Sequence, residues 1–226
     1  ALLVFALTMR LGFWQLDRAH QRESLDSQLS ALKASRPIAL GDVPVTSAAL
    51  EFHSLEATGE WQPQHRVFLD NQIFRGRPGF HVFMPLKLEG SNRHVLVNRG
   101  WIAGLSDREK LPVVNTVVGS QRVSGFARLS PPTFSSIAGT SRVESVWSEL
   151  SLKGFAQWSG LQLQPVILYQ VGGSEDGLVR EWPNPGLGAE RNRGYAFQWF
   201  ALAVMTAVFW AMNFYRRRDN ANKNHE

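Results

Sequence analysis

The side chains that usually carry out chemistry are few and scattered in this 226-residue chain. There is no cysteine, which excludes disulfide scaffolds, thiolate metal sites, iron–sulfur clusters and cysteine nucleophiles. Six histidines are present, but none forms a close metal-ligand pair such as H-x-x-x-H. No G-x-S-x-G motif, Walker loop or G-x-G-x-x-G motif occurs, and no paired carboxylates indicate acid–base catalysis. Spacing alone therefore nominates no active site, and we expect a protein that is not an enzyme.

Arginine and amide side chains offer binding chemistry instead. Arg99 lies in the run N-R-G-W at residues 98–101, which we place at the end of a strand. Two interpretations stay open for this run. One is an ordinary turn in which Arg99 pairs with a carboxylate. The other is a polar corner at the membrane surface, where the planar guanidinium fork holds a ligand carboxylate or a partner's loop.

Two apolar segments would position further candidates. Residues 195–215 carry no charge, and at about 1.5 Å per residue they reach roughly 30 Å, the thickness of the bilayer's hydrocarbon core. A buried core helix is disfavoured, because this segment is apolar on every face. Residues 1–17 are predicted to be a first transmembrane helix with a truncated start. The alternative, a cleaved signal peptide, lacks a small-residue cleavage site.

Side chains near the outer ends of the two predicted spans have the chemistry to contact each other or a ligand. Gln15 and Gln198 lie at matching depth, so their amides have the reach to bond across the helices. For Trp14 and Trp199, interfacial anchoring is the alternative. Arg191 and Arg193 precede the second span, where contact with lipid headgroups is the ordinary role.

The distribution of charge predicts how the chain is oriented in the membrane. The tail 216–226 opens with three arginines, and the positive-inside rule therefore puts both termini in the cytoplasm. The segment between the spans is long enough to translocate whatever its charge, so we expect a periplasmic domain in a multi-pass protein of the bacterial inner membrane. The net charge of +5 comes from dilute charges, and we expect a lipid bilayer rather than nucleic acid as partner.

Periodicity indicates the fold of the middle. Residues 18–36 are predicted as an amphipathic helical extension that ends at Pro37. Residues 80–88 alternate as a strand with one buried face, and Pro85 suggests an edge or a bulge. With 94–99 they predict a hairpin turning at 89–92. Further strands are expected near 54–61, 65–70, 121–128 and 166–172, a short helix within 146–159 ending at Gly160, and loops at 105–120 and 173–189.

The fold class predicted from these patterns is an α+β membrane protein. Two transmembrane helices flank a β-rich antiparallel domain at 37–190. Within it, residues 52–172 are predicted to form an antiparallel, strongly twisted sheet with at least five strands and at least one packed helix.

Three motifs together resemble the Surfeit-locus-one family of the bacterial type. They are L-G-F-W-Q at residues 11–15, V-L-V-N-R-G-W at 95–101 and Y-A-F-Q-W-F at 195–200, and their order and spacing cover the chain end to end. The resemblance implies an assembly factor for haem-copper cytochrome c oxidase that assists insertion of haem a into subunit I. Subunit I is the implied partner, with haem a synthase as a further candidate.

The same resemblance implies a transient haem a site where the spans leave the membrane. Some bacterial members are thought to bind the iron with a histidine three residues before the motif tyrosine, here Tyr195, and that position holds Asn192. An amide is a poor haem ligand, so we expect no stable haem or an altered axial state, with His20 as the substitute ligand. The candidate cofactor-binding residues are Trp14, Gln15, Arg18, Arg99, Asn192, Tyr195, Gln198 and Trp199.

Two other functions remain open on the residues. A membrane-anchored interaction or sensory module without a cofactor would explain the missing histidine. A membrane enzyme of cofactor maturation would need a nucleophile, metal cluster or carboxylate pair that the residues do not indicate.

Overall fold

The computed structural model describes residues 2–45, 49–105, 107, 110–129, 142–143, 145–173, 176–182 and 188–223. It divides into two compact units. The helical unit comprises residues 1–30 and 183–226, and the β-rich unit comprises residues 31–182. The predicted loop 173–189 and the predicted tail 216–226 both lie partly outside the described residues.

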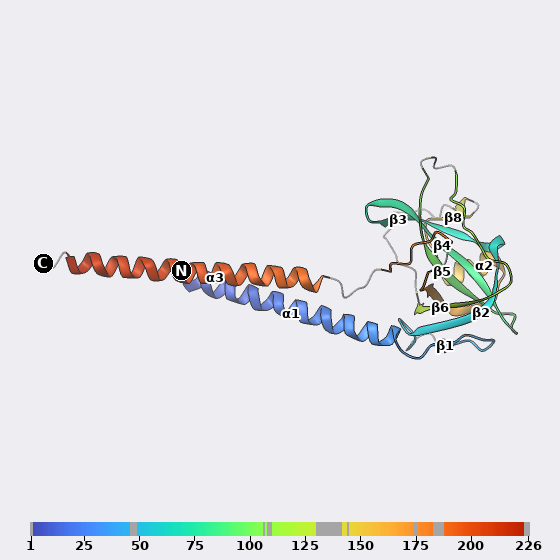
Figure 1. Cartoon of the computed structure of the whole chain (residues 1–226), viewed down its shortest axis with the longest axis horizontal. Helices are drawn as coiled ribbons and strands as arrows, with labels where there is room; N and C mark the ends of the chain where they lie inside the picture. Colours follow the sequence, from blue (N-terminus) through green and yellow to red (C-terminus); the bar gives the residue numbers. More distant parts are fainter. Residues whose placement is uncertain are drawn as a thin grey trace. The chain divides into compact units, whose positions relative to one another are not determined.

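Three α-helices, nine strands and a 3₁₀ turn make up the described chain, and Figure 1 shows most of them labelled. In chain order they are α1 (Leu2–Lys33), β1 (Ile38–Ala39), β2 (Ser54–Trp61), η2 (Pro63–His65), β3 (Val67–Phe74), β4 (Arg77–Leu88), β5 (His94–Ala103), β6 (Ser120–Arg128), β7 (Arg142–Val143), β8 (Val146–Trp147), α2 (Leu152–Ser159), β9 (Leu163–Gln170) and α3 (Ala189–Lys223).

Both long helices extend beyond the spans predicted within them. α1 is continuous through the predicted extension and ends before Pro37, while α3 runs past 195–215 at both ends. Among the described residues, one helix is long and apolar enough to cross a membrane, α3 over Ala189–Arg216. The N-terminal span therefore stays a prediction.

Five strands of the β-rich unit close into a barrel. β2 pairs with β6, β6 with β9, β9 with β5, β5 with β4, and β4 pairs again with β2. β3 continues the sheet beside β4, and β8 and β7 follow it. The hairpin predicted from 80–88 and 94–99 is confirmed as β4 and β5, which pair from Gly79↔Ala103 to Lys87↔His94.

The prediction of an antiparallel domain is wrong for three strand pairs. β5 and β9 run parallel inside the barrel, and β1–β2 and β3–β8 are also parallel. Parallel neighbours need a long crossover between them. The chain between β5 and β9 supplies it, because that segment contains β6, β8 and α2.

The core has a barrel interior and outer layers. Leu86, Val95 and Val97 belong to a cluster to which all five barrel strands contribute. Phe83 and Leu96 point the other way, into a second cluster that includes α2. The expectation of one buried face on 80–88 is therefore wrong, because the outside of the barrel is covered as well.

Pro85 occupies neither a sheet edge nor a bulge. It pairs with Leu96 of β5 on one side. On its other side the neighbour of β4 changes, since β3 pairs as far as Phe83 and β2 begins at Leu86. Proline has no N–H to donate, and this change of partner is a place where a ladder bond is not needed.

The predicted helix within 146–159 is shorter than expected. Val146 and Trp147 instead form β8, because they pair with Phe68 and Leu69 of β3. The helix α2 begins after Ser151, whose hydroxyl accepts the Gly154 N–H. Its end is as predicted, with Gly160 in the left-handed region at φ 70°.

Replacing Gly125 with alanine should destabilise the barrel by about 2 kcal/mol. A Cβ there would lie 2.2 Å from the Tyr169 carbonyl oxygen, so β6 and β9 must move apart. Urea unfolding of the full chain in detergent, followed by tryptophan fluorescence, measures the loss. Gly41→Ala is the control, since nothing lies within 4 Å of a Cβ there. Equal stability of the two variants would contradict the close approach of these strands.

Candidate functional site

The two helices of the helical unit pack through small side chains. Thr8, Gly12 and Ala19 are buried on α1, and Ala196 and Ala203 on α3. A Cβ on Gly12 would lie 2.5 Å from the Phe200 ring, so glycine allows this close approach. Phe13 meets the same ring edge-on, with centroids 5.3 Å apart.

An ion pair holds the two helices together nearer the start of α3. Arg193 binds Glu23 at 2.6 Å and also Glu190, one turn earlier on its own helix, at 3.2 Å. Together with the Gly12–Phe200 contact, this pair shows that the helices run antiparallel. Residues of α3 from Arg193 to Phe200 therefore face residues of α1 from Glu23 back to Gly12.

A hollow of about 500 Å³ opens between the helices in this region. It is within the usual size of small-molecule sites, about 300–1,000 Å³. Its lining residues are Trp14, Gln15, Arg18, Gln21, Arg22, Arg191, Asn192 and Tyr195. We call it the interhelical hollow.

Positive charge and aromatic surface dominate the interhelical hollow. Arg18, Arg22 and Arg191 line it, and among the described residues no carboxylate is part of the lining. The Arg18 guanidinium lies 5.7 Å from the centre of the Trp14 ring, and Trp14 and Tyr195 are each about half exposed. The arrangement suits an anionic ligand with a flat apolar body, because arginine binds carboxylates and aromatic rings pack on planar groups.

Gly188 makes room for Arg22, one of the arginines that line this hollow. Its φ is 109°, which disfavours other residues, and a Cβ there would lie 2.3 Å from Nη1 of Arg22. The guanidinium of Arg22 thus lies against the backbone just before α3. The absence of a side chain at Gly188 makes room for that contact.

The structure brings together five of the eight residues predicted to bind a cofactor. They are Trp14, Gln15, Arg18, Asn192 and Tyr195. Gln198 and Trp199 do not line the interhelical hollow, and Gln198 is exposed. His20, the predicted substitute ligand, is also exposed and outside the lining, since its neighbour Ala19 is the residue that faces α3.

Sequence reasoning missed three lining residues, and helical spacing was the signal for them. Gln21 and Arg22 follow Arg18 by three and four residues, so all three share one face of α1. Arg191 precedes Tyr195 by four residues on α3. Headgroup contact is its expected ordinary role, and the structure places it in the lining of the hollow.

Arg99 belongs to the β-rich unit, where it is buried within β5 rather than at a strand end. Its Nη2 donates to Asp176 at 2.9 Å and to the Asn115 carbonyl at 3.0 Å, while Nη1 donates to Thr116 at 2.9 Å. The guanidinium also stacks over Trp61 at 4.8 Å. The pairing with a carboxylate is confirmed, but the turn is wrong, because residues 98–101 lie within the strand.

Burial sets the electrostatics around Arg99. Desolvation lowers the pKa of its guanidinium, and Asp176 opposes that effect. Arg180 binds the same Asp176 oxygen, and the side chains of both residues are almost fully buried. Two arginines thus share one carboxylate in a buried place.

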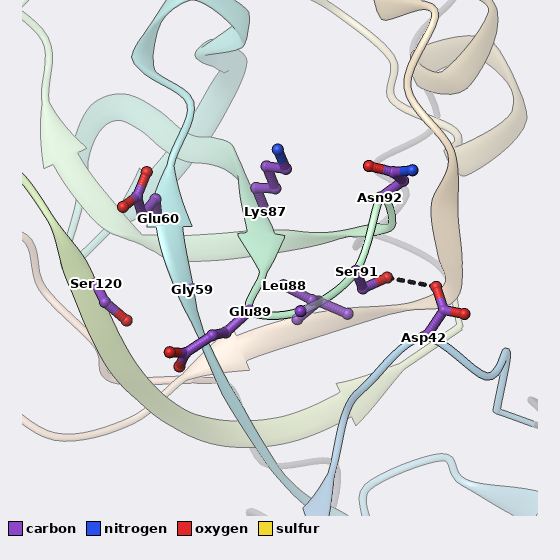
Figure 2. Close-up of a pocket in the computed structure, with 10 residues that line it drawn as sticks. Asp42, Gly59, Glu60, Lys87, Leu88, Glu89, Ser91, Asn92 and Ser120 are labelled. Carbon is purple, nitrogen blue, oxygen red and sulfur yellow. Dashed lines mark hydrogen bonds between the residues drawn. The ribbon is translucent and has the colours of Figure 1, made fainter.

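A second hollow, at the turn between β4 and β5, collects carboxylates. Figure 2 shows Glu60 and Glu89 on one side of it and Asp42 on the other, where Asp42 accepts a hydrogen bond from Ser91 at 2.7 Å. Lys87 lines the same hollow. Among the described residues, no group of three or more His, Asp or Glu side chains is arranged to hold a metal ion.

Comparison with known proteins identifies the family. The SURF1 family matches residues 2–204, which include all eight predicted site residues. The chain belongs to the SURF1 family.

Named relatives agree with that membership over nearly the whole chain. A SURF1-like protein of Rickettsia felis is 27% identical over 96% of this chain and 95% of its own length. The Surfeit locus protein 1 of Takifugu rubripes is 22% identical over 96% of both chains, and that of Mus musculus is 21% identical over 96% of this chain and 75% of its own. The predicted resemblance is therefore confirmed.

Proposed function

We propose that this SURF1 protein is a membrane-anchored assembly factor for haem-copper cytochrome c oxidase and that it is not an enzyme. The family is known generally as cytochrome oxidase assembly factors. The observation that carries the rest of the proposal is the interhelical hollow, where three arginines and two aromatic rings converge from two helices. Haem a matches that chemistry, being a flat, largely apolar ring with two propionates.

The arginines fit the propionates. Arg18 and Arg191 are exposed and line the hollow from opposite helices, so their guanidinium groups would hold the propionates. Trp14 and Tyr195 supply ring faces for the macrocycle. When bound, haem a would bring its iron for delivery to subunit I, while the residues of this chain hold and orient it.

The iron ligand fits less well. Asn192 lines the hollow at the position where the family would place histidine, and its amide is a poor ligand. Tyr195 lines the same hollow, and a tyrosine oxygen is one of the known haem ligands. We infer weak or altered axial ligation, in keeping with a carrier that releases its haem.

The membrane topology in this proposal has two spans, cytoplasmic termini and a periplasmic β-rich unit in a bacterial inner membrane. α3 is long and apolar enough to cross. At the start of α1, Leu2, Leu3 and Leu7 are more than half exposed, as expected for side chains that face lipid. Arg216 follows the apolar part of α3 on the side assigned to the cytoplasm.

Subunit I of the oxidase is the proposed partner, with haem a synthase as the source of the haem. A carrier that binds both in turn must give up its ligand, and a hollow that is open to solvent with weak axial ligation favours such a transfer. The step therefore needs no catalytic group on this chain.

Replacing Asn192 with histidine should raise the haem content of the purified protein. An imidazole at this position adds an axial ligand to the arginine contacts already present. The full chain, expressed in a host that makes haem a and purified in detergent, is measured by visible absorption per protein. Asn213→His, farther along the same helix and outside the hollow, is the matched control.

Any one of three outcomes would contradict this site. The first is that the unchanged protein already carries full haem. The second is that Asn213→His raises the haem content as much as Asn192→His, and the third is that Arg18→Gln combined with Arg191→Gln leaves haem binding unchanged. The assembly role itself is tested separately, by oxidase activity in membranes of a strain that lacks the gene.

A further inference from the structure

The barrel sheet has a gap beside β6, because the pairing of β9 with β6 stops before the start of β6 is reached. β6 pairs with β9 only from Gly125↔Gln170 onward, and the last bond runs from the Val171 N–H to the Ser124 carbonyl at 2.9 Å. Along a strand, backbone groups of alternate residues point to the same side. Arg122 therefore turns its N–H and C=O toward the continuation of β9. Among the described residues it has no backbone partner on that side.

On its other side this part of β6 is paired with β2, so only the side toward β9 lacks a neighbouring strand. Thr58 of β2 lies opposite Arg122, and the pairing of these strands continues to Glu60↔Ser120. On the far side of the gap, Trp101 of β5 is paired with Val179 through two backbone bonds of 2.8 Å. An additional strand in the gap would therefore pair with β6.

A hollow of about 630 Å³ follows this open edge, and we call it the β6 hollow. Arg99, Arg122 and Gln170 contribute polar groups to its lining. Arg99 Nε and Gln170 Oε1 are buried and have no hydrogen-bond partner among the described residues.

Charge in the β6 hollow favours an acidic ligand. Two arginines, Arg99 and Arg122, line the hollow, and Asp176 is the single carboxylate in its described lining. Asp176 also binds Arg180. Arg122 pairs with Glu56 at 2.8 Å, but its side chain is 72% exposed, so that pair contributes little and can exchange for another carboxylate. By contrast, the hollow of Figure 2 has three carboxylates and one lysine among its lining.

Apolar side chains at the rim indicate a polypeptide rather than a small anion. Val117 and Val171 line the β6 hollow and are 63% and 43% exposed, and the neighbouring Val118 is 94% exposed. Exposed valines beside an open strand edge and a positively charged wall are the features that recognise an extended segment with alternating apolar and acidic residues.

We propose that the β6 hollow binds an acidic, extended segment of a partner protein, which adds as a strand beside Arg122 in the continuation of β9. The backbone of the segment pairs with the edge of β6, one or two of its carboxylates reach Arg122, and its apolar side chains cover the exposed valines. This docking is independent of haem binding, because all its residues belong to the β-rich unit.

The test uses a fluorescein-labelled peptide of alternating valine and glutamate and the full chain in detergent, with fluorescence anisotropy as the readout. Arg122→Gln should weaken binding about tenfold, the effect of losing one charge-assisted contact. The matched control is Arg77→Gln, which removes an exposed arginine from β4 away from the hollow. Val117→Asp is the second variant, and its added charge at the exposed rim should repel the same peptide.

Any one of three results would overturn the proposal. The first is that a peptide of alternating valine and lysine binds as tightly as the glutamate peptide. The second is that Arg122→Gln and Val117→Asp both bind the glutamate peptide like Arg77→Gln, and the third is that this peptide shows no binding at millimolar concentration. Displacement of the peptide by inorganic phosphate at equal concentration would assign the hollow to a free anion instead. Far-ultraviolet circular dichroism of each variant confirms that the comparison is between folded proteins.

Discussion

Replacing Arg99 with methionine should lower the free energy of unfolding of the β-rich unit by about 3 kcal/mol. The change removes the donors that satisfy Asp176, Thr116 and the Asn115 carbonyl in a buried place. Arg180 still binds Asp176, which keeps the loss at the lower end of the range for broken buried pairs. Urea unfolding of the full chain in detergent, read by tryptophan fluorescence, measures this loss.

Arg75→Met is the matched control for this experiment. Arg75 also binds a carboxylate with good geometry, with Nη2 2.9 and 2.8 Å from the two oxygens of Glu181, but both side chains are largely exposed. Its removal should cost less than about 1 kcal/mol, because water replaces the lost partner. If the two variants were equally stable, the Arg99 network would not be the buried anchor that its burial and contacts indicate.

Acid should destabilise the β-rich unit through His81 by up to about 3 kcal/mol. Burial lowers the pKa of His81 from 6.5 to about 4. The unfolded chain therefore binds a proton between pH 6.5 and 4 that the folded chain does not. Stability from this group is complete above pH 6.5 and is lost as the pH falls toward 4.

The hydrogen bonds around His81 give the same sign. The Asn98 amide nitrogen lies 3.1 Å from Nδ1 of His81, and its oxygen accepts the Gly100 N–H at 3.3 Å. An amide nitrogen only donates, so Nδ1 must accept and the ring proton is assigned to Nε2. Protonation of Nδ1 would turn two donors toward each other.

The measurement is the free energy of unfolding at pH 7 and at pH 4.5, for the protein and for His81→Gln. Other titrating groups contribute equally to both proteins, including His94, whose pKa burial also lowers. The variant should therefore lose less stability between the two pH values. An equal loss would show that His81 is not the group that responds.

Local pattern was sufficient for much of the fold. Alternation and turn residues predicted β4, β5 and their hairpin, and Gly160 correctly marked the end of α2. These signals are short-range, since side-chain alternation and positive φ depend on neighbouring residues alone. Closure of the barrel and the parallel β5–β9 pair depend on which distant strands meet, and no periodicity within one strand carries that information.

The burial of Arg99 is the clearest case in which local pattern and tertiary structure disagree for a strand. The run at residues 98–101 looks like a polar strand end, yet Arg99 is buried in the middle of β5. Its partner Asp176 lies 77 residues away in the chain, so the network forms only once the tertiary structure brings them together. A buried arginine is tolerable because that carboxylate and the aromatic ring of Trp61 compensate for lost water.

The sequence by itself determined the family, the apolar character of α3 and the clustering of arginines and aromatic rings near the two predicted spans. Only the tertiary structure decided which of them share a hollow. Antiparallel packing through Gly12 and Ala196 sets the offset of α1 against α3, and this offset places Asn192 and Tyr195 beside Trp14 but leaves His20 exposed. The physical reason is that each helix turns about 100° per residue, so the face a residue shares depends on the partner helix as well as on its own spacing.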